Sequence, residues 1–92
     1  MLAVGEFGRS PKINAKAGRD HWQSCYSALV AGGGLRTSQV VGSSNPLGEY
    51  PASRPVSPGD LAMTLYHQLG IGTTQLTQAG MTPVGEVVEE LL

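Results

Sequence analysis

The sequence predicts a small α/β fold with two or three short strands and one clear helix. Two apolar runs, at residues 1–4 and 25–31, have the length of strands rather than of helices. Between Ser57 and Gly70 the sequence instead has a helix cap, an apolar repeat every four residues and a glycine stop. With 92 residues, of which 40% are hydrophobic, residues 1–92 can form one small domain but not a large buried core.

The first strand is predicted over residues 1–6, ending at Glu6. Its apolar residues follow one another without alternation, which is typical of a strand buried in a parallel sheet. A loop is predicted over residues 7–21, because its glycines and Ser10-Pro11 favour turns and extended backbone over helix. The second strand is predicted over residues 24–31, where it meets three consecutive glycines.

These glycines, Gly32 to Gly34, could cradle a phosphate if a helix began directly after them. Residues 35–38 lack the pattern of a helix start, so a plain strand exit is the favoured interpretation. Further short strands are predicted at residues 39–42 and 54–56. The stretch around them is rich in Ser, Pro, Gly and Asn, and we expect it to be irregular.

The best-defined element is a helix over residues 58–69. Ser57 is a good N-cap, Pro58 suits the first helical position, and Asp60 places a negative charge in the first turn. Gly70 supplies the left-handed residue that ends many helices. The apolar stripe comprises Leu61, Ala62, Leu65, Tyr66 and Leu69. This stripe implies a sheet for the helix to cover.

The remainder of the chain has weaker signals. Residues 73–78 are polar and are predicted to form a loop, and residues 81–84 an extended segment. Apolar residues then recur with helical spacing, at Val84, Val87, Val88 and Leu91. The chain from about Gly85 is therefore predicted to be a short amphipathic helix.

Composition excludes several classes of protein. A net charge of −1 and an aromatic content of 5% argue against a nucleic-acid partner. No apolar run approaches the roughly 20 residues of a membrane helix, so no membrane partner is expected. No basic segment precedes the apolar residues at the start, so the sequence predicts no signal peptide and does not indicate a cellular location. Cys25 is the one cysteine, which excludes an internal disulfide.

Chemically useful side chains concentrate in residues 5–22. This stretch holds four of the six basic residues (Arg9, Lys12, Lys16 and Arg19) together with Glu6, Asp20 and His21. Carboxylate and imidazole are good ligands for a divalent metal, and guanidinium groups match phosphate or sulfate oxygens. The spacing of Glu6 and His21 fits no compact metal motif, so a solvated loop of mixed charge explains the residue types equally well.

Three blocks of sequence carry a family resemblance: GEFGRSPKINAKAGRDHW, then YSALVAGGGL, then RPVSPGDLAMTLYHQLGI. In this order they resemble the C-terminal part of the sulfatase-like family called domain of unknown function 1501. That family is similar to the alkaline phosphatase and sulfatase superfamily. The resemblance implies that residues 1–92 are a C-terminal fragment of an alkaline-phosphatase-like α/β sandwich, with the catalytic nucleophile upstream and no catalytic residue in this chain.

The resemblance also assigns roles to individual residues. Glu6 falls at the position of an acidic metal ligand, and His21 at that of a later histidine ligand. Phe7 stands where many relatives have a metal-binding histidine. Arg9 is assigned to the substrate oxyanion and Asp20 to the support of neighbouring groups. The implied cofactor is a divalent metal such as zinc or calcium, and the implied substrates are phosphate or sulfate esters.

Two functions of different classes follow. The first is the C-terminal part of a metal-dependent hydrolase-like protein, inactive as this fragment; the alternative is a small non-catalytic module that binds an anion or a partner. In the first case, the Glu6 carboxylate and the His21 ring should lie within about 10 Å of each other at one edge of the fold. Arg9 should point toward the same pocket, with Trp22 packed beside it. His67 is expected to be structural or exposed to solvent.

Overall fold

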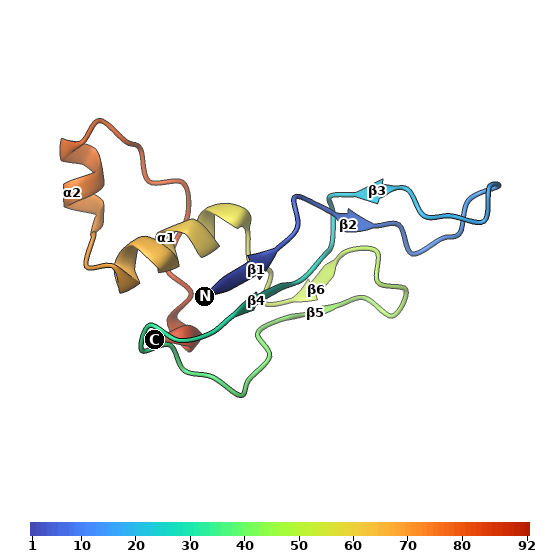
Figure 1. The fold of residues 1–92 in the computed structure, drawn as a ribbon, viewed down its shortest axis with the longest axis horizontal. Coiled ribbons are helices and arrows are strands. Elements are labelled where there is room, and N and C mark those ends of the chain that lie inside the picture. The colour runs from blue at the N-terminus through green and yellow to red at the C-terminus, as the bar shows by residue number, and fades with distance from the viewer. The chain divides into compact units, whose positions relative to one another are not determined.

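The computed structural model describes residues 1–92 and divides them into two compact units. The strand unit comprises Met1–Ala31 and Val40–Pro55, and the helix unit comprises Gly32–Gln39 and Val56–Leu92. Short strands occur in the first unit and helices in the second (Figure 1), so the predicted α/β class is confirmed.

The strand unit contains three two-stranded sheets, all antiparallel. The pairs are β1 (Leu2–Val4) with β4 (Ala28–Val30), β2 (Gly8–Arg9) with β3 (His21–Trp22), and β5 (Ser43–Ser44) with β6 (Pro51–Ser53). The prediction of strands at residues 39–42 and 54–56 is wrong. The residues that pair, Ser43–Ser44 and Pro51–Ser53, lie between these two segments. There the backbone of Asn45 bonds to that of Tyr50, which closes the β5–β6 turn.

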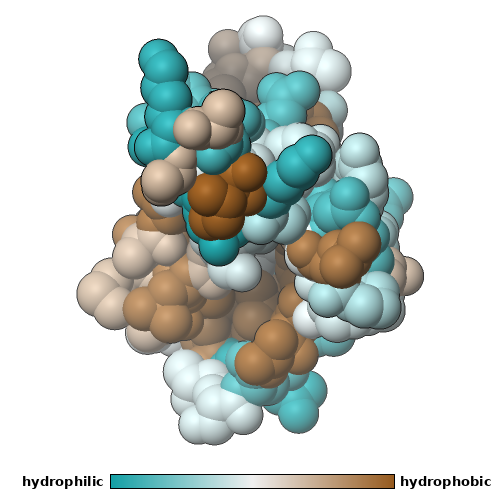
Figure 2. Space-filling model, turned by 90° about the vertical axis from the view of Figure 1, so that its right-hand side faces the viewer, coloured by the Kyte–Doolittle hydropathy of each residue, from teal (hydrophilic) through white to brown (hydrophobic).

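The first sheet corrects the prediction of a buried parallel strand. β1 is only three residues long, and it pairs antiparallel with β4, with Leu2 opposite Val30. Both of its faces are open to solvent, as shown by the exposed fractions of Val4 (46%) and Leu29 (59%). Apolar composition signals a strand but carries no information on the direction of its neighbour or on what covers it. Figure 2 shows hydrophobic residues exposed among hydrophilic ones on the face that it draws.

The predicted loop at residues 7–21 is a hairpin whose ends pair as β2 and β3. Its interior is fixed by hydrogen bonds. The backbone N–H of Ser10 donates to the Asp20 carbonyl at 2.9 Å, and the Asn14 side-chain oxygen accepts from the backbone N–H groups of Lys16 and Gly18, each at 3.0 Å. Ser10 is the buried residue of this hairpin. The charged stretch is therefore an ordered turn, although its side chains are mostly exposed.

The helix unit confirms the predicted helix as α1 (Pro58–Gln68). The Ser57 hydroxyl accepts from the Asp60 N–H at 3.0 Å and the Asp60 carboxylate accepts from the Ser57 N–H at 2.9 Å, which forms a capping box. At the other end Gly70 has φ +79°, and the Ile71 N–H donates to the Tyr66 carbonyl, as in a Schellman motif. The buried face is centred on Met63 and Thr64 rather than on the leucine stripe.

Two predictions for the C-terminal part are wrong. Residues 73–78 form a helix, α2 (Thr73–Gln78), rather than a loop. The helix predicted from Gly85 is reduced to one 3-10 turn, η1 (Glu89–Leu91). Val88, just before η1, is buried together with Met63 and Leu76 to form the small core of this unit. None of the helices is long and apolar enough to cross a membrane.

The triple glycine follows β4 and has positive φ at all three positions. The Leu35 N–H bonds back to the Gly32 carbonyl at 3.1 Å, and no helix follows, so these glycines make an open turn. Within the helix unit, the next residues bond to the C-terminal turn. The Arg36 N–H donates to the Leu91 carbonyl at 2.9 Å, and the Gln39 side chain donates to the Glu90 carbonyl at 2.6 Å.

Candidate functional site

The β2–β3 hairpin positions most of the residues that the sequence singles out. In its register Gly8 lies opposite Trp22, and Arg9 lies opposite His21. Residues directly opposite each other share a face of an antiparallel pair, and residues two apart along a strand share it as well. Arg9 and His21 therefore belong to one face and Trp22 to the other, and Phe7, the residue before β2, lies on the side of Arg9 and His21, because its ring contacts both of them.

Close packing holds the Trp22 face in place. A Cβ atom on Gly8 would lie 2.7 Å from the Cys25 carbonyl oxygen and from the Tyr26 Cβ, so glycine is what permits this approach of the backbone. The Trp22 indole N–H donates to the Glu49 carbonyl at 2.8 Å, and its ring packs against Tyr50 with centroids 6.0 Å apart. Trp22 is thus a structural anchor of the hairpin.

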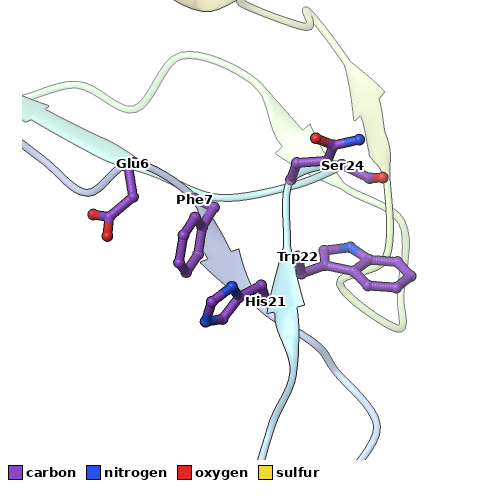
Figure 3. A pocket seen from close by; sticks show the side chains of 6 residues that line it. Glu6, Phe7, His21, Trp22 and Ser24 are labelled. Carbon is purple, nitrogen blue, oxygen red and sulfur yellow. The ribbon is translucent and has the colours of Figure 1, made fainter.

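An open pocket of about 480 Å³ adjoins this part of the hairpin. Its lining residues are Glu6, Phe7, His21, Trp22, Gln23 and Ser24. Figure 3 shows the side chains of Glu6, Phe7 and His21 projecting to one side, whereas the Trp22 ring projects to the other. The structure thus brings the two sequence-predicted metal ligands, Glu6 and His21, to the same pocket.

An aromatic stack occupies the centre of this group. The Phe7 and His21 rings lie with centroids 4.0 Å apart and planes inclined by 26°. The Arg9 guanidinium carbon lies over the Phe7 ring, 5.7 Å from its centroid. Arg9 does not line the pocket itself, and its remaining contact is a long hydrogen bond of 3.4 Å to the Arg19 carbonyl.

Asp20 is directed into the turn rather than into this pocket. Its carboxylate accepts a hydrogen bond from the Asn14 side-chain amide at 3.0 Å, and its backbone N–H donates to the Ser10 hydroxyl at 2.9 Å. It lines a second hollow, on the side of Trp22 and Glu49. The structure therefore places Asp20 where it orders the hairpin turn.

Arg19 has a structural contact that its residue type did not reveal. Its guanidinium donates to the carbonyls of Ser10 and Pro11, at 2.8 and 2.7 Å. The exposed side chains of Lys12 and Lys16 make no comparable contact. Of the basic residues that cluster in the sequence, Arg19 thus stabilises the turn, whereas Lys12 and Lys16 are open to solvent.

The donor set fits part of a metal site. Carboxylate and imidazole on one pocket suit zinc or a similar divalent ion. No group of three or more His, Cys, Asp or Glu residues lies close enough together to hold a metal ion, so Glu6 and His21 by themselves are not a complete ligand set. Sequence analysis missed the contact that Phe7 makes at this pocket, and its position directly before β2, two residues from Arg9, was the available signal.

Fold and pocket together describe a small α/β protein with an exposed carboxylate and an exposed imidazole beside the β2–β3 hairpin. Over residues 1–91 the chain matches the family described as "Protein of unknown function (DUF1501)", and it belongs to this family. No curated protein and no solved structure is a significant match to the chain.

Proposed function

We propose that this chain is the C-terminal part of a metal-dependent hydrolase-like protein of the sulfatase and alkaline phosphatase superfamily, acting on phosphate or sulfate esters. The observation that carries the proposal is that Glu6 and His21, fifteen residues apart in the sequence, line one pocket. Membership of the DUF1501 family is in accord with the sequence blocks from which the superfamily resemblance was drawn.

Each side chain has a role in this proposal. The Glu6 carboxylate and the His21 imidazole would bind a divalent ion such as zinc or calcium. The bound ion would supply Lewis-acid stabilisation of the ester oxygens. Arg9 would bind the remaining oxygens of the anionic group, because guanidinium presents two parallel donors to phosphate or sulfate. Its 3.4 Å hydrogen bond to Arg19 is weak enough to be exchanged for a substrate contact.

Residues 1–92 alone do not complete such a site. A catalytic zinc site commonly has three protein ligands and an open position. The further ligands and the nucleophile would come from protein outside these residues. We therefore expect the 92-residue chain to have no measurable phosphatase or sulfatase activity.

Calorimetric titration of the chain with zinc tests the metal assignment. We expect Glu6→Gln and His21→Ala each to weaken zinc affinity by about tenfold, since each variant removes one of two ligands. His67→Ala is the matched control, because His67 is the other histidine and is exposed on α1. Equal affinity in His21→Ala and the unmodified chain would refute the metal assignment. If the 92-residue chain hydrolyses an aryl phosphate or aryl sulfate and His21→Ala abolishes this activity, the prediction that the site is incomplete is refuted.

The second candidate, a non-catalytic anion-binding module, is favoured by the exposed side chains of Lys12 and Lys16 on the ordered turn. In that case sulfate would bind without metal, and Lys12→Ala combined with Lys16→Ala would abolish the binding. Glu6→Gln would leave it unchanged. Metal-free sulfate binding of this kind would favour the module over the hydrolase.

A further inference from the structure

We propose that Phe7 is the positioning residue of His21, holding the imidazole ring in the orientation that it presents to the pocket. The inference deepens the proposed function and rests on it where metal binding is concerned. The orientation of the ring by Phe7, however, is a property of the hairpin that can be measured without any metal.

The contacts of His21 are the basis of this inference. His21 is exposed, and no protein group forms a hydrogen bond with its imidazole. A histidine that binds metal normally donates its other ring N–H to a carboxylate, a carbonyl or a water, which fixes the plane of the ring. In this chain the Phe7 ring stacks on the His21 ring, with the two ring centroids 4.0 Å apart, and so restricts the plane of the imidazole.

The hairpin explains why Phe7 can do this. Gly8, the next residue, has no Cβ and lets β2 approach the backbone at Cys25 and Tyr26 closely. This approach fixes the course of the strand on both sides of Gly8. Arg9, on the same face, places its guanidinium over the Phe7 ring and adds a cation–π contact. Phe7 is therefore less exposed than His21 and has a second partner in Arg9, so it can act as the support of the pair.

The first measurement is made on the metal-free chain by proton NMR. Only two histidines are present, so the two sets of imidazole signals can be assigned with His67→Ala. In the unmodified chain the His21 ring protons should carry an upfield ring-current shift from Phe7. The shift should be lost in Phe7→Leu, which keeps an apolar side chain without a ring, and kept in Phe7→Tyr, which restores the ring.

The second measurement is zinc affinity by calorimetry on the same variants. Aromatic pairs contribute enough free energy that Phe7→Leu should weaken zinc binding about three- to tenfold. Phe7→Tyr should remain within about twofold of the unmodified chain, because the stack is preserved. A general loss of structure in the strand unit would affect both variants and would also appear in the signal of the Trp22 indole N–H, which donates to the Glu49 carbonyl and serves as the internal control.

The outcomes separate the two proposals. An unchanged His21 shift in Phe7→Leu overturns the positioning role whatever the zinc titration gives. The positioning role is also overturned if Phe7→Leu loses the His21 shift but keeps its zinc affinity, provided that His21→Ala weakens zinc binding. Zinc binding that ignores both Glu6 and His21 refutes the metal assignment, and the positioning role is then decided by the Hα–Hβ couplings of His21, which should report one side-chain rotamer in the unmodified chain and in Phe7→Tyr but averaging among rotamers in Phe7→Leu; equal couplings in all three chains overturn it. A lost shift with weakened affinity, both rescued by Phe7→Tyr, supports the positioning role and the metal site.

Discussion

The strand unit and the helix unit obtain their order in different ways. In the strand unit Ser10 is the one buried residue, and short antiparallel pairs are joined by turns rich in hydrogen bonds. The helix unit buries Met63, Thr64, Leu76 and Val88 between its helices and its C-terminal turn. The first unit is thus specified by local polar contacts and close backbone approach, and the second by a small apolar core.

The candidate site belongs to the unit without an apolar core. Two-stranded pairs are marginal by themselves in water, so other contacts must hold the hairpin. In this chain they are the glycine at position 8, the Trp22 anchor and the Asn14-centred turn. The site geometry therefore depends on a few nearby residues, and substitutions in the two units should have different and separable effects.

The largest expected effect is the loss of the helix unit in Gly59→Ala. A Cβ at this position would overlap the Val84 carbonyl, which is backbone and cannot move aside as a side chain would. We expect a destabilisation of about 3 kcal/mol, measured by urea unfolding followed by circular dichroism. Gly70→Ala is the comparison, because its φ of +79° is strained but its surroundings are open. It should cost only about 1 kcal/mol. Equal effects would argue against the tight contact at Gly59.

Next in size is the truncation of the core in Val88→Ala. Val88 is 1% exposed, whereas Val84, on the same apolar repeat, is 66% exposed. Removing two buried methyl groups should lower the free energy of unfolding by about 2 kcal/mol. Val84→Ala should change it by less than about 0.5 kcal/mol. Similar values for the two variants would mean that the C-terminal turn does not pack as the structure has it.

A smaller effect is expected at the cap of α1. The Asp60 carboxylate accepts hydrogen bonds from the backbone N–H groups of Ser57 and Glu86, each at 2.9 Å, so Asp60→Ala removes a helix cap and a link to the chain after α2. We expect a loss of about 1.5 kcal/mol. Ser57→Ala removes one partner of the cap and should cost about 1 kcal/mol. A larger loss in Ser57→Ala would show that the link to Glu86 contributes little.

The smallest effect should be confined to the strand unit. Arg19→Ala removes the two hydrogen bonds to the carbonyls of Ser10 and Pro11 from a largely exposed turn. The local cost should be about 1 kcal/mol, seen as faster hydrogen exchange of the Ser10 amide, with the unfolding of α1 unchanged. Lys16→Ala is the control and should alter neither. A shift of the α1 transition in Arg19→Ala would show that the two units are not independent.

Local signals predicted the elements whose stability is itself local. Ser57, Pro58, Asp60 and Gly70 indicated α1, and each has the capping role expected of it. The same kind of signal is present for α2. At the end of α2, Gly80 and Met81 donate backbone hydrogen bonds in the same pattern as Gly70 and Ile71 at the end of α1. Helix α2 could thus have been predicted, because its polar composition does not oppose a capped short helix.

Strand pairing and the pocket could be predicted only in part. The apolar residues of β1 and β4 indicated strands, but their antiparallel register and their exposure depend on partners far along the chain. The residue types of Glu6 and His21 indicated metal chemistry, and their presence in one pocket follows from the pairing of β2 with β3. Asp20 was predicted to support the site, whereas its hydrogen bonds place it in the turn.

The sequence by itself determined helix α1, the α/β class and the set of residues able to do chemistry, because caps, stops and functional groups are properties of a few neighbouring residues. Only the tertiary structure decided which of these residues meet. The contact of Phe7 with His21, the clamp formed by Arg19 and the burial of Met63 rather than of the leucine stripe all arise from register and packing. Those depend on residues distant in the sequence, and no local pattern encodes them.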